Sequence, residues 1–430
     1  MSKESFLLKE VLKFPLTNAL FGRRSRRFGV GMEIPSGPLK YNSNFSAMPL
    51  TEFEESLLIA AATGVTGWNF GIPHGPANPN AHADHAVRFT GRTMPTAAGI
   101  GTPILFYTND NGIFVINTRG INPNQISEMK DMEEITEWIL ENCHKNSSKL
   151  GDSRLDLPSI PGHILDPNLW WANKPGSTLF MPIGDASEEM LGVLSIFLEN
   201  GYLIMDDQTG QPAGNLEPFI SSGLLNKDKP FPLSFLETNT FQANCAELSF
   251  MGHNMVLMMQ AMGLGGLYFV GLNPMSILGA PTAEGIKGLG FTFVENEDWT
   301  VPNPVGLDGI YEALCPPYFP TMRAAVEMFA KRKYGPEGAY NPNTPGPWKE
   351  SSKVKKTVSP YSEEMTDCLS EVAQYIYDKY GKFPGTNPTI ALTGFIQAHH
   401  LDIEYYDKFF KSKGYMETHA THMKRWHSKK

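Results

Sequence analysis

A dense cluster of arginines lies near the start of the chain, in residues 21–29, which read FGRRSRRFG. Guanidinium groups form paired, charge-assisted hydrogen bonds with phosphate oxygens, and a serine hydroxyl can add another hydrogen bond. The cluster is conspicuous because the chain as a whole is acidic, with a formal net charge of -9 at pH 7. These residues therefore form a candidate phosphate-binding site. The alternative interpretation is a basic helix end that is exposed to solvent.

A second candidate site lies in residues 91–99, which read GRTMPTAAG and precede an apolar segment. Small side chains allow the backbone to approach a ligand closely, and Pro95 restricts the backbone within the turn. A flat ligand that carries a phosphate group could lie against such a backbone. Many glycine-containing turns bind no ligand, so an ordinary turn is the alternative.

Histidines suggest a different chemistry, because they gather in two parts of the sequence. The first group comprises His74, His82 and His85, and the second comprises His399, His400, His419, His422 and His427. Imidazole is a common ligand of transition metals, and the spacing of His82 and His85 is compatible with metal binding. No HExxH motif and no paired ExxH motif accompanies them. A histidine-ligated metalloenzyme is therefore an alternative hypothesis, and we assign no metal ligand from the sequence.

The overall composition and the absence of other motifs exclude several classes of protein. The sequence has no GxSxG motif, no P-loop and no GxGxxG after a predicted strand. An acidic chain does not suit nucleic-acid binding, and no apolar run reaches the ~18 residues that a membrane helix needs. The four cysteines lie far apart and predict no disulfide framework. Without a recognisable signal peptide, we expect a soluble cytoplasmic protein.

Periodicity and capping signals predict the elements that carry these residues. Residues 51–54 read TEFE, a capping box, and apolar residues then repeat at helical spacing up to residue 63. Two short strands, 103–107 and 113–116, are expected to form a hairpin. Methionines at helical spacing in residues 242–262 indicate a helix packed in the core, which a glycine-rich segment ends. Further helices are expected at 127–142, 190–198, 320–333, 363–379 and 403–411, and strands at 202–205 and 267–270.

The order of these motifs resembles that of the nitroreductase superfamily of FMN-dependent flavoproteins. RRSRRF is followed by a helix that ends LLIAAATG, then by GRTMPTAAG and the strand GIFVI. The sequence looks closest to the branch of SagB-type dehydrogenases and azoline oxidases, where a similar R-T-x-P-S-A-G loop precedes an aliphatic strand. Thr96 stands where serine is usual and keeps the hydroxyl group. The later GHNMVLMMQAMGLGGLYFVG is similar to the family's long dimer-core helix and its G-L-G turn.

The resemblance implies a homodimer with an α+β fold, in which helices flank a central, mostly antiparallel sheet and one FMN binds at each end of the shared interface. By position, Arg23, Arg24, Ser25 and Arg27 would hold the FMN phosphate, and the backbone around Gly265 and Gly266 would face the reactive nitrogen of the ring. Pro95, Thr96, Ala97 and Gly99 would line the isoalloxazine ring, with Arg92 nearby. The basic residue that usually completes the phosphate site has no clear equivalent, and Lys331, Arg332 and Lys382 are candidates.

The chain is longer than the usual domain of this family. We expect residues 1–295 to form the nitroreductase-like core, with an insertion near 120–240, and residues 296–430 to form a C-terminal extension packed on it. The leading hypothesis is an FMN-dependent oxidoreductase that transfers hydride between the flavin and a small planar organic substrate, with NAD(P)H as a candidate electron donor. A non-catalytic nitroreductase-like binding protein is a second alternative. No catalytic residue is assigned.

Overall fold

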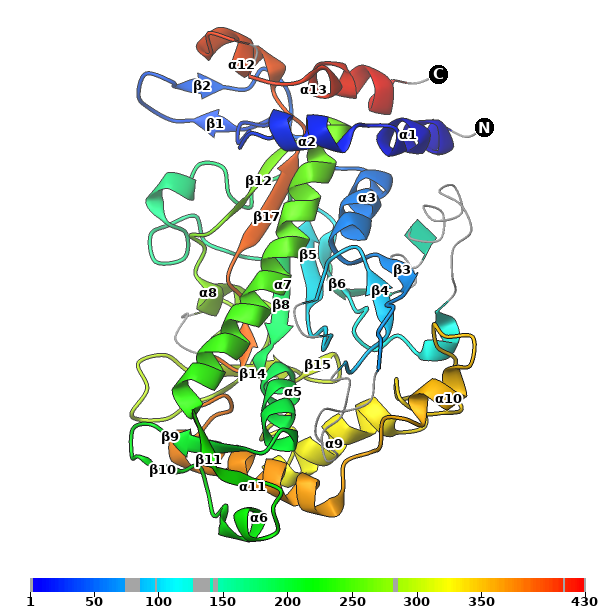
Figure 1. Ribbon diagram of the computed structural model, residues 1–430. Coiled ribbons are helices and arrows are strands. Elements are labelled where there is room, and N and C mark those ends of the chain that lie inside the picture. The colour runs from blue at the N-terminus through cyan, green and yellow to red at the C-terminus, as the bar shows by residue number, and fades with distance from the viewer. Residues whose placement is uncertain are drawn as a thin grey trace.

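A seven-stranded sheet lies at the centre of the computed structural model, which describes residues 3–73, 86–96, 99–126, 140–141, 146–280, 285–412 and 414–428. Its strands follow one another in the order β12 (Gly265–Phe269), β17 (Phe395–His399), β8 (Thr178–Asp185), β5 (Ile104–Asn109), β6 (Gly112–Ile116) and β7 (Ser147–Gly151), and β16 (Ile390–Ala391) also pairs with β8 (Figure 1). Every pair in this sheet is antiparallel. The predicted combination of an antiparallel sheet with helices is therefore confirmed, as is the hairpin of β5 and β6.

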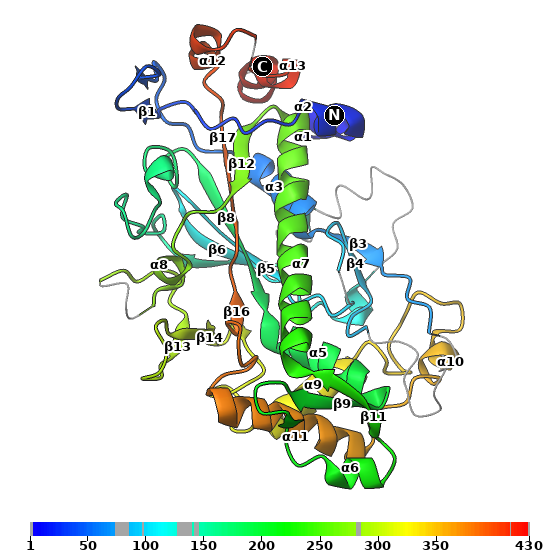
Figure 2. The ribbon, with the colours of Figure 1, turned by 60° about the vertical axis from the view of Figure 1, so that its left-hand side comes forward.

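The longest helix, α7 (Leu233–Met262), spans 30 residues, or about 45 Å, and lies against β8, β12 and β17 (Figure 2). Met251, Met255 and Met259 are fully buried on its inner side, so the methionine stripe packs in the core as predicted. The helix starts nine residues before the predicted segment, which begins at residue 242. It ends where the sequence predicts, at Gly263, whose φ of 85° is left-handed.

The helix α3 (Glu52–Thr63) packs against α7 and begins with the predicted capping box. Oγ1 of Thr51 accepts the backbone N–H of Glu54 at 3.3 Å, and Oε2 of Glu54 accepts the backbone N–H of Thr51 at 2.7 Å. These reciprocal bonds satisfy donors that the first turn of a helix leaves without a partner. They also hold the Glu54 carboxylate in one orientation.

Both ends of the chain lie at the same end of the molecule (Figure 1). The elements gathered there are α1 (Lys3–Leu12), α2 (Leu16–Gly22), β1 (Glu33–Ile34), β2 (Tyr41–Asn42), α12 (Ile403–Phe409), α13 (Glu417–His422) and a π-helical turn, η3 (Met423–His427). The opposite end holds α5 (Ala186–Glu199), α9 (Met322–Tyr334) and α11 (Glu363–Tyr380), which pack on one another. The predicted helices near 190–198, 320–333, 363–379 and 403–411 are thus present, whereas most of 127–142 lies outside the described residues.

The centre of the sheet differs from the expected division into a core, an insertion and an extension. β8 belongs to the expected insertion and β17 to the expected extension, yet the two strands are neighbours, with Phe180 opposite Ile396. Both segments therefore contribute to the core. Every residue of both strands is buried, so neither strand shows the polar alternation that identifies a half-buried strand in a sequence.

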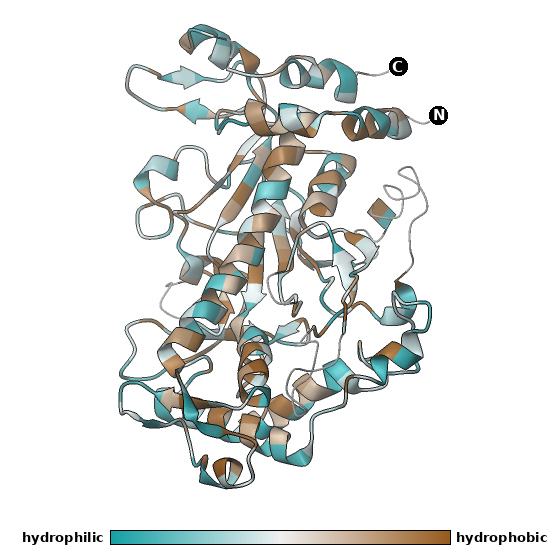
Figure 3. Cartoon of the chain, in the orientation of Figure 1, coloured by the Kyte–Doolittle hydropathy of each residue, from teal (hydrophilic) through white to brown (hydrophobic). Residues whose placement is uncertain are grey.

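The other elements surround this core. They are β3 (Val65–Trp68), β4 (Thr90–Arg92), β9 (Tyr202–Asp206), β10 (Gln211–Pro212), β11 (Asn226–Pro232), β13 (Thr292–Val294), β14 (Asn303–Leu307), β15 (Tyr311–Glu312), α6 (Glu217–Ser221), α8 (Pro274–Leu278), α10 (Ser351–Lys355), η1 (Pro123–Gln125) and η2 (Asp166–Asn168). Apolar residues concentrate in the sheet and along the helix sides that face it (Figure 3). Among the described helices, none combines the length and the apolar character that crossing a membrane requires.

A pair of leucine substitutions tests the packing of α3 in the core. Leu58 is 0% exposed, so Leu58→Ala should leave a cavity and lower the free energy of unfolding by about 2–5 kcal/mol. Leu16, at the start of α2, is 64% exposed, and Leu16→Ala should change the free energy of unfolding by less than about 0.5 kcal/mol. Urea denaturation followed by circular dichroism measures both values. If both substitutions lowered the free energy of unfolding equally, burial of the inner face of α3 would not be what stabilises its packing.

Candidate functional site

The arginine cluster lies next to the glycine pair at the start of β12. The backbone N–H of Gly266 donates to the carbonyl of Arg26 at 2.8 Å, and the two residues form an isolated antiparallel bridge. Arg26, which the sequence analysis did not assign to the site, points inward and donates to Oε1 of Gln260 at 2.7 Å and to the carbonyl of Gly414 at 2.8 Å. Burial lowers the pKa of Arg26 to about 10. Arg26 therefore anchors the cluster to α7.

The predicted phosphate ligands themselves are exposed. Arg23, Arg24, Ser25 and Arg27 all reach solvent. Arg24 donates to the carbonyl of Arg23 at 2.7 Å, and the guanidinium of Arg27 lies 5.7 Å from the ring centre of Trp171. Within the part of the chain that the structure describes, no carboxylate forms an ion pair with any of these three arginines. Three positive charges are thus concentrated here, and no carboxylate among the described residues neutralises them.

The two glycines beside this cluster have a packing role of their own. Gly266 has a φ of 140°, and a Cβ atom on it would lie 2.1 Å from the carbonyl oxygen of Gln397. A Cβ atom on Gly265 would lie 2.8 Å from Nε2 of His399. Close contact between β12 and β17 therefore requires both glycines, whether or not a ligand approaches them.

The second predicted site, residues 91–99, is held by internal hydrogen bonds. The guanidinium of Arg92 donates to the carbonyl of Thr118, and burial lowers its pKa to about 10. The hydroxyl of Thr96 donates to Oε1 of Glu247 on α7 and accepts the backbone N–H of Gly99 at 3.1 Å. Arg92 thus stabilises the turn. Ala97 lies outside the described residues.

Pro95, Thr96 and Gly99 line a cleft of about 350 Å³. Trp68 and Phe70 form part of its wall. A larger cleft of about 680 Å³ adjoins it and shares the side chains of Trp68, Arg88 and Thr90. Lys331 and Arg332, two of the predicted basic candidates, line the larger cleft together with Arg119. Lys382 lies elsewhere, 5.4 Å from the ring centre of Trp299.

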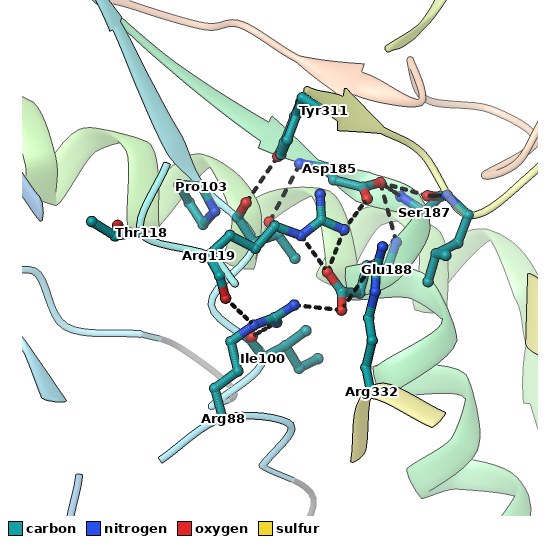
Figure 4. A network of polar contacts seen from close by, with 12 residues as sticks. Arg88, Ile100, Pro103, Thr118, Arg119, Asp185, Ser187, Glu188, Tyr311 and Arg332 are labelled. Atoms are coloured by element: carbon teal, nitrogen blue, oxygen red, sulfur yellow. Dashed lines mark hydrogen bonds and ion pairs between the residues drawn. The ribbon is translucent and has the colours of Figure 1, made fainter. Parts of the chain in front are cut away.

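A buried ionic network, which the sequence analysis missed, supports the wall of the larger cleft (Figure 4). Arg119 donates to Oε2 of Glu188 at 2.8 Å and to Oδ2 of Asp185 at 2.7 Å. Arg88 donates to Oε1 of Glu188 at 2.8 Å, and Arg332 lies 3.1 Å from the same oxygen. Burial alone would raise the pKa of Glu188, but the charges of the three arginines hold it well below its usual range. Within this network three cations meet two anions, whereas Lys331, Glu312 and Glu337 add further charges of both signs to the lining of the cleft.

The two predicted halves of the flavin site meet α7 at different levels. Thr96 contacts the helix at Glu247, and Arg26 contacts it at Gln260. The contacts of Thr96 and Arg26 lie thirteen residues apart, a rise of about 20 Å, whereas the carbonyl of Thr93, in the same turn as Thr96, accepts a hydrogen bond from Asn254, about 9 Å from Gln260 along the helix. The cleft that Pro95 and Thr96 line contains no residue of the arginine cluster. One chain therefore does not bring both halves to the same cleft.

The C-terminal histidines form a separate cluster around Glu54. Nε2 of His400, His422 and His427 lies 3.2, 2.9 and 3.1 Å, respectively, from Oε1 of Glu54. His74, His82 and His85 lie outside the described residues. The sequence analysis recognised Glu54 only as part of a capping box. The burial of a carboxylate in the first turn of a helix depends on contacts that no local pattern predicts.

Comparisons with known proteins provide little information about the function of this chain. No family model matches the chain, and no curated protein matches it. Among solved structures, the chain matches a Ralstonia eutropha JMP134 protein whose assignment as a nitroreductase is itself provisional. The two chains are 13% identical, the match covers 60% of this chain and 71% of the other, and the TM-score is 0.28. Values this low carry no conclusion about fold or function, and the SagB-type branch gains no support.

Two arginine substitutions test whether burial makes the network important. Arg119→Met leaves the carboxylates of Asp185 and Glu188 with one cation fewer, so the free energy of unfolding should fall by about 3–5 kcal/mol. Arg323 also contacts three carboxylates, but at the surface of the protein. Arg323→Met should therefore lower the free energy of unfolding by less than about 1 kcal/mol. Chemical denaturation of the two variants decides the point. If the two substitutions lowered the free energy of unfolding by similar amounts, the number of ionic contacts would determine their contribution to stability and the burial of those contacts would not.

Proposed function

We propose that this protein is an FMN-dependent oxidoreductase of nitroreductase type, which transfers hydride between the flavin and a small planar organic substrate. The observation that carries the proposal is the group of exposed arginines beside Gly265 and Gly266, which have no carboxylate partner among the described residues. An acidic protein that concentrates three exposed guanidinium groups at one place gains a local binding site for an anion. NAD(P)H is the candidate electron donor.

A phosphate monoester suits this cluster in charge and in geometry. Guanidinium groups donate in pairs to phosphate oxygens, and Arg23, Arg24 and Arg27 are not engaged by described carboxylates. The hydroxyl of Ser25 lies in the same exposed segment and can donate one further hydrogen bond. Arg26 keeps the segment in place from the inside, through Gln260. The cluster would thus hold the phosphate of FMN.

The cleft beside residues 91–99 suits a planar group. Its wall includes the rings of Trp68 and Phe70, against which a flat ligand can stack, and Gly99 lines it without a side chain. A bound flavin supplies the redox chemistry, while the residues of the cleft orient the reacting partners and exclude water. No side chain is assigned as a general acid or base.

A homodimer would bring these two places together. Because the cleft beside residues 91–99 contains no residue of the arginine cluster of the same chain, a second copy would contribute the phosphate-binding half of the flavin site. We propose that the cluster of one subunit faces the cleft of its partner. The dimer would then hold two equivalent flavin sites, one at each end of its interface.

Flavin binding by the purified chain tests the proposal. The protein should show flavin absorbance bands, or bind added FMN with one equivalent per subunit, and should run as a dimer in light scattering. The double variant Arg23→Ala and Ser25→Ala removes one ionic and one neutral hydrogen bond, so FMN affinity should fall by about 10- to 100-fold. Fluorescence titration of the flavin measures this change.

A matched control removes the same charge and hydroxyl elsewhere. Ser352 and Lys353 are exposed on α10, and Ser352→Ala with Lys353→Ala should leave FMN affinity unchanged. If both double variants bind FMN as tightly as the unaltered chain, the phosphate site is in the wrong place. A chain that has no flavin bands and takes up no FMN would contradict the proposal as a whole.

A further inference from the structure

The histidine cluster around Glu54 joins parts of the chain that are far apart in sequence. Glu54 lies in the first turn of α3, His400 follows β17, and His422 and His427 lie in the last segment of the chain. Oε1 of Glu54 and the three Nε2 atoms all lie within 4.8 Å of one another. Glu54 and His400 are fully buried, and the most exposed side chain of the four, His427, is 12% exposed.

The π-helical turn η3 determines that two of the histidines face the same way. Five residues separate His422 from His427, and in an α-helix this spacing turns the side chains about 140° apart. A π-helix closes its hydrogen bonds between residues five apart, so residues at this spacing lie nearly above one another. The turn Met423–His427 therefore directs both imidazoles to Glu54. Turns of this kind are frequent at functional sites.

Backbone carbonyls orient two of the rings from behind. Nδ1 of His400 lies 3.0 Å from the carbonyl oxygen of Met48, and Nδ1 of His422 lies 2.8 Å from that of Met262. A carbonyl can only accept, so the proton of each ring lies on Nδ1. In a neutral ring, Nε2 then presents its lone pair to Glu54. Histidines that bind a metal through one ring nitrogen typically donate the N–H of the other nitrogen to a carbonyl or carboxylate, as Nδ1 does here.

The carboxylate is held in the same manner. Oε2 of Glu54 accepts the backbone N–H of Thr51 at 2.7 Å and its hydroxyl at 2.9 Å. This leaves Oε1 to face the three imidazoles. Glu54 is therefore set to offer a single oxygen, as a monodentate ligand does.

Lone pairs that face a carboxylate oxygen in a buried place repel it unless a positive charge lies between them. A divalent cation accepts an electron pair from all four atoms at once. We propose that Glu54, His400, His422 and His427 bind one divalent transition-metal ion, with Zn²⁺ preferred.

The distances from the carboxylate oxygen to the three nitrogens suit such an ion. Zinc lies about 2.0–2.1 Å from imidazole nitrogen and about 2.0–2.2 Å from carboxylate oxygen, so two ligand atoms lie about 3.3–3.4 Å apart at tetrahedral angles and about 2.9 Å apart at right angles. The three nitrogens lie 2.9–3.2 Å from Oε1 of Glu54. An ion can thus enter with small movements of the side chains. Imidazole with one carboxylate suits Zn²⁺ better than Mg²⁺ or Ca²⁺.

Four protein ligands in a buried place point to a structural role. Structural zinc sites fill all four positions with side chains, whereas catalytic sites keep one position for water. By binding all four side chains, the ion would connect α13 and η3 to α3 and to the residue that follows β17. Trp426 supports this arrangement, because its ring stacks on His422 at 5.3 Å with an interplanar angle of 20°. The site shares no residue with the proposed flavin site, so either can be present without the other.

Metal analysis of the full chain, produced without a histidine tag, tests the site. Mass spectrometry should find about one equivalent of zinc per chain. His427→Ala removes the ligand nearest to solvent and should reduce the bound metal at least fivefold. His253→Ala is the matched control, since His253 is exposed on α7 outside the cluster, and it should retain the full equivalent. Equal metal contents in the two variants would overturn the assignment of the ligands.

Cobalt provides a readout that does not depend on recovery of a particular metal. After removal of metal with a chelator, the unaltered chain should bind one equivalent of Co²⁺ and develop the intense visible bands of a four-coordinate site, while His427→Ala should not. Failure of the unaltered chain to bind either Zn²⁺ or Co²⁺ would overturn the proposal. This test requires no flavin.

Loss of the metal should also loosen the C-terminal segment. The chelated chain should unfold at a temperature lower by on the order of 5 °C, and a protease should cleave near residues 417–428 faster than in the metal-loaded chain. The Tm of His253→Ala should respond to the chelator as that of the unaltered chain does. If metal binds but neither Tm nor cleavage changes on its removal, the structural role is wrong.

Discussion

The packing of α7 against the central sheet is the constraint on which the candidate sites depend. Three of its residues, Glu247, Gln260 and Met262, accept hydrogen bonds from Thr96, Arg26 and His422, respectively. A helix of 30 residues is stiff, so it sets the distances between the turn at residues 91–99, the arginine cluster and the histidine cluster. The cleft beside residues 91–99 contains no residue of the arginine cluster, which is why we invoke a second subunit.

Close packing around α7 also explains residues that the sequence analysis assigned to a ligand. Gly265 and Gly266 leave no room for a Cβ atom against β17, and a Cβ atom on Gly263 would lie 2.2 Å from the carbonyl oxygen of Thr418. The glycine-rich segment after α7 is therefore needed for the sheet and for the approach of the C-terminal segment. The glycines are compatible with a bound flavin, but they do not by themselves require one.

Arginines serve two different purposes in this acidic chain. Arg88, Arg119 and Arg332 surround the buried carboxylates of Asp185 and Glu188, where their charges are largely used within the protein. Arg23, Arg24 and Arg27 are exposed and have no carboxylate partner among the described residues. The first group stabilises the wall of a cleft, whereas the second is available to an anion from solution. The histidine cluster adds a third polar centre, which is independent of both.

The sequence by itself determined the local elements: the capping box of α3, the methionine stripe and glycine stop of α7, and the hairpin of β5 and β6. These follow from contacts between residues near one another in the chain, which leave a period or a cap that can be read directly. Only the tertiary structure decided that β8 and β17 are central strands, that Arg119 meets Glu188, and that Glu54 meets His400, His422 and His427. Glu54 and His400 are separated by 346 positions, and the contact arises because the last segment folds back onto α3. No local pattern encodes such an encounter, since it depends on how several buried surfaces fit together.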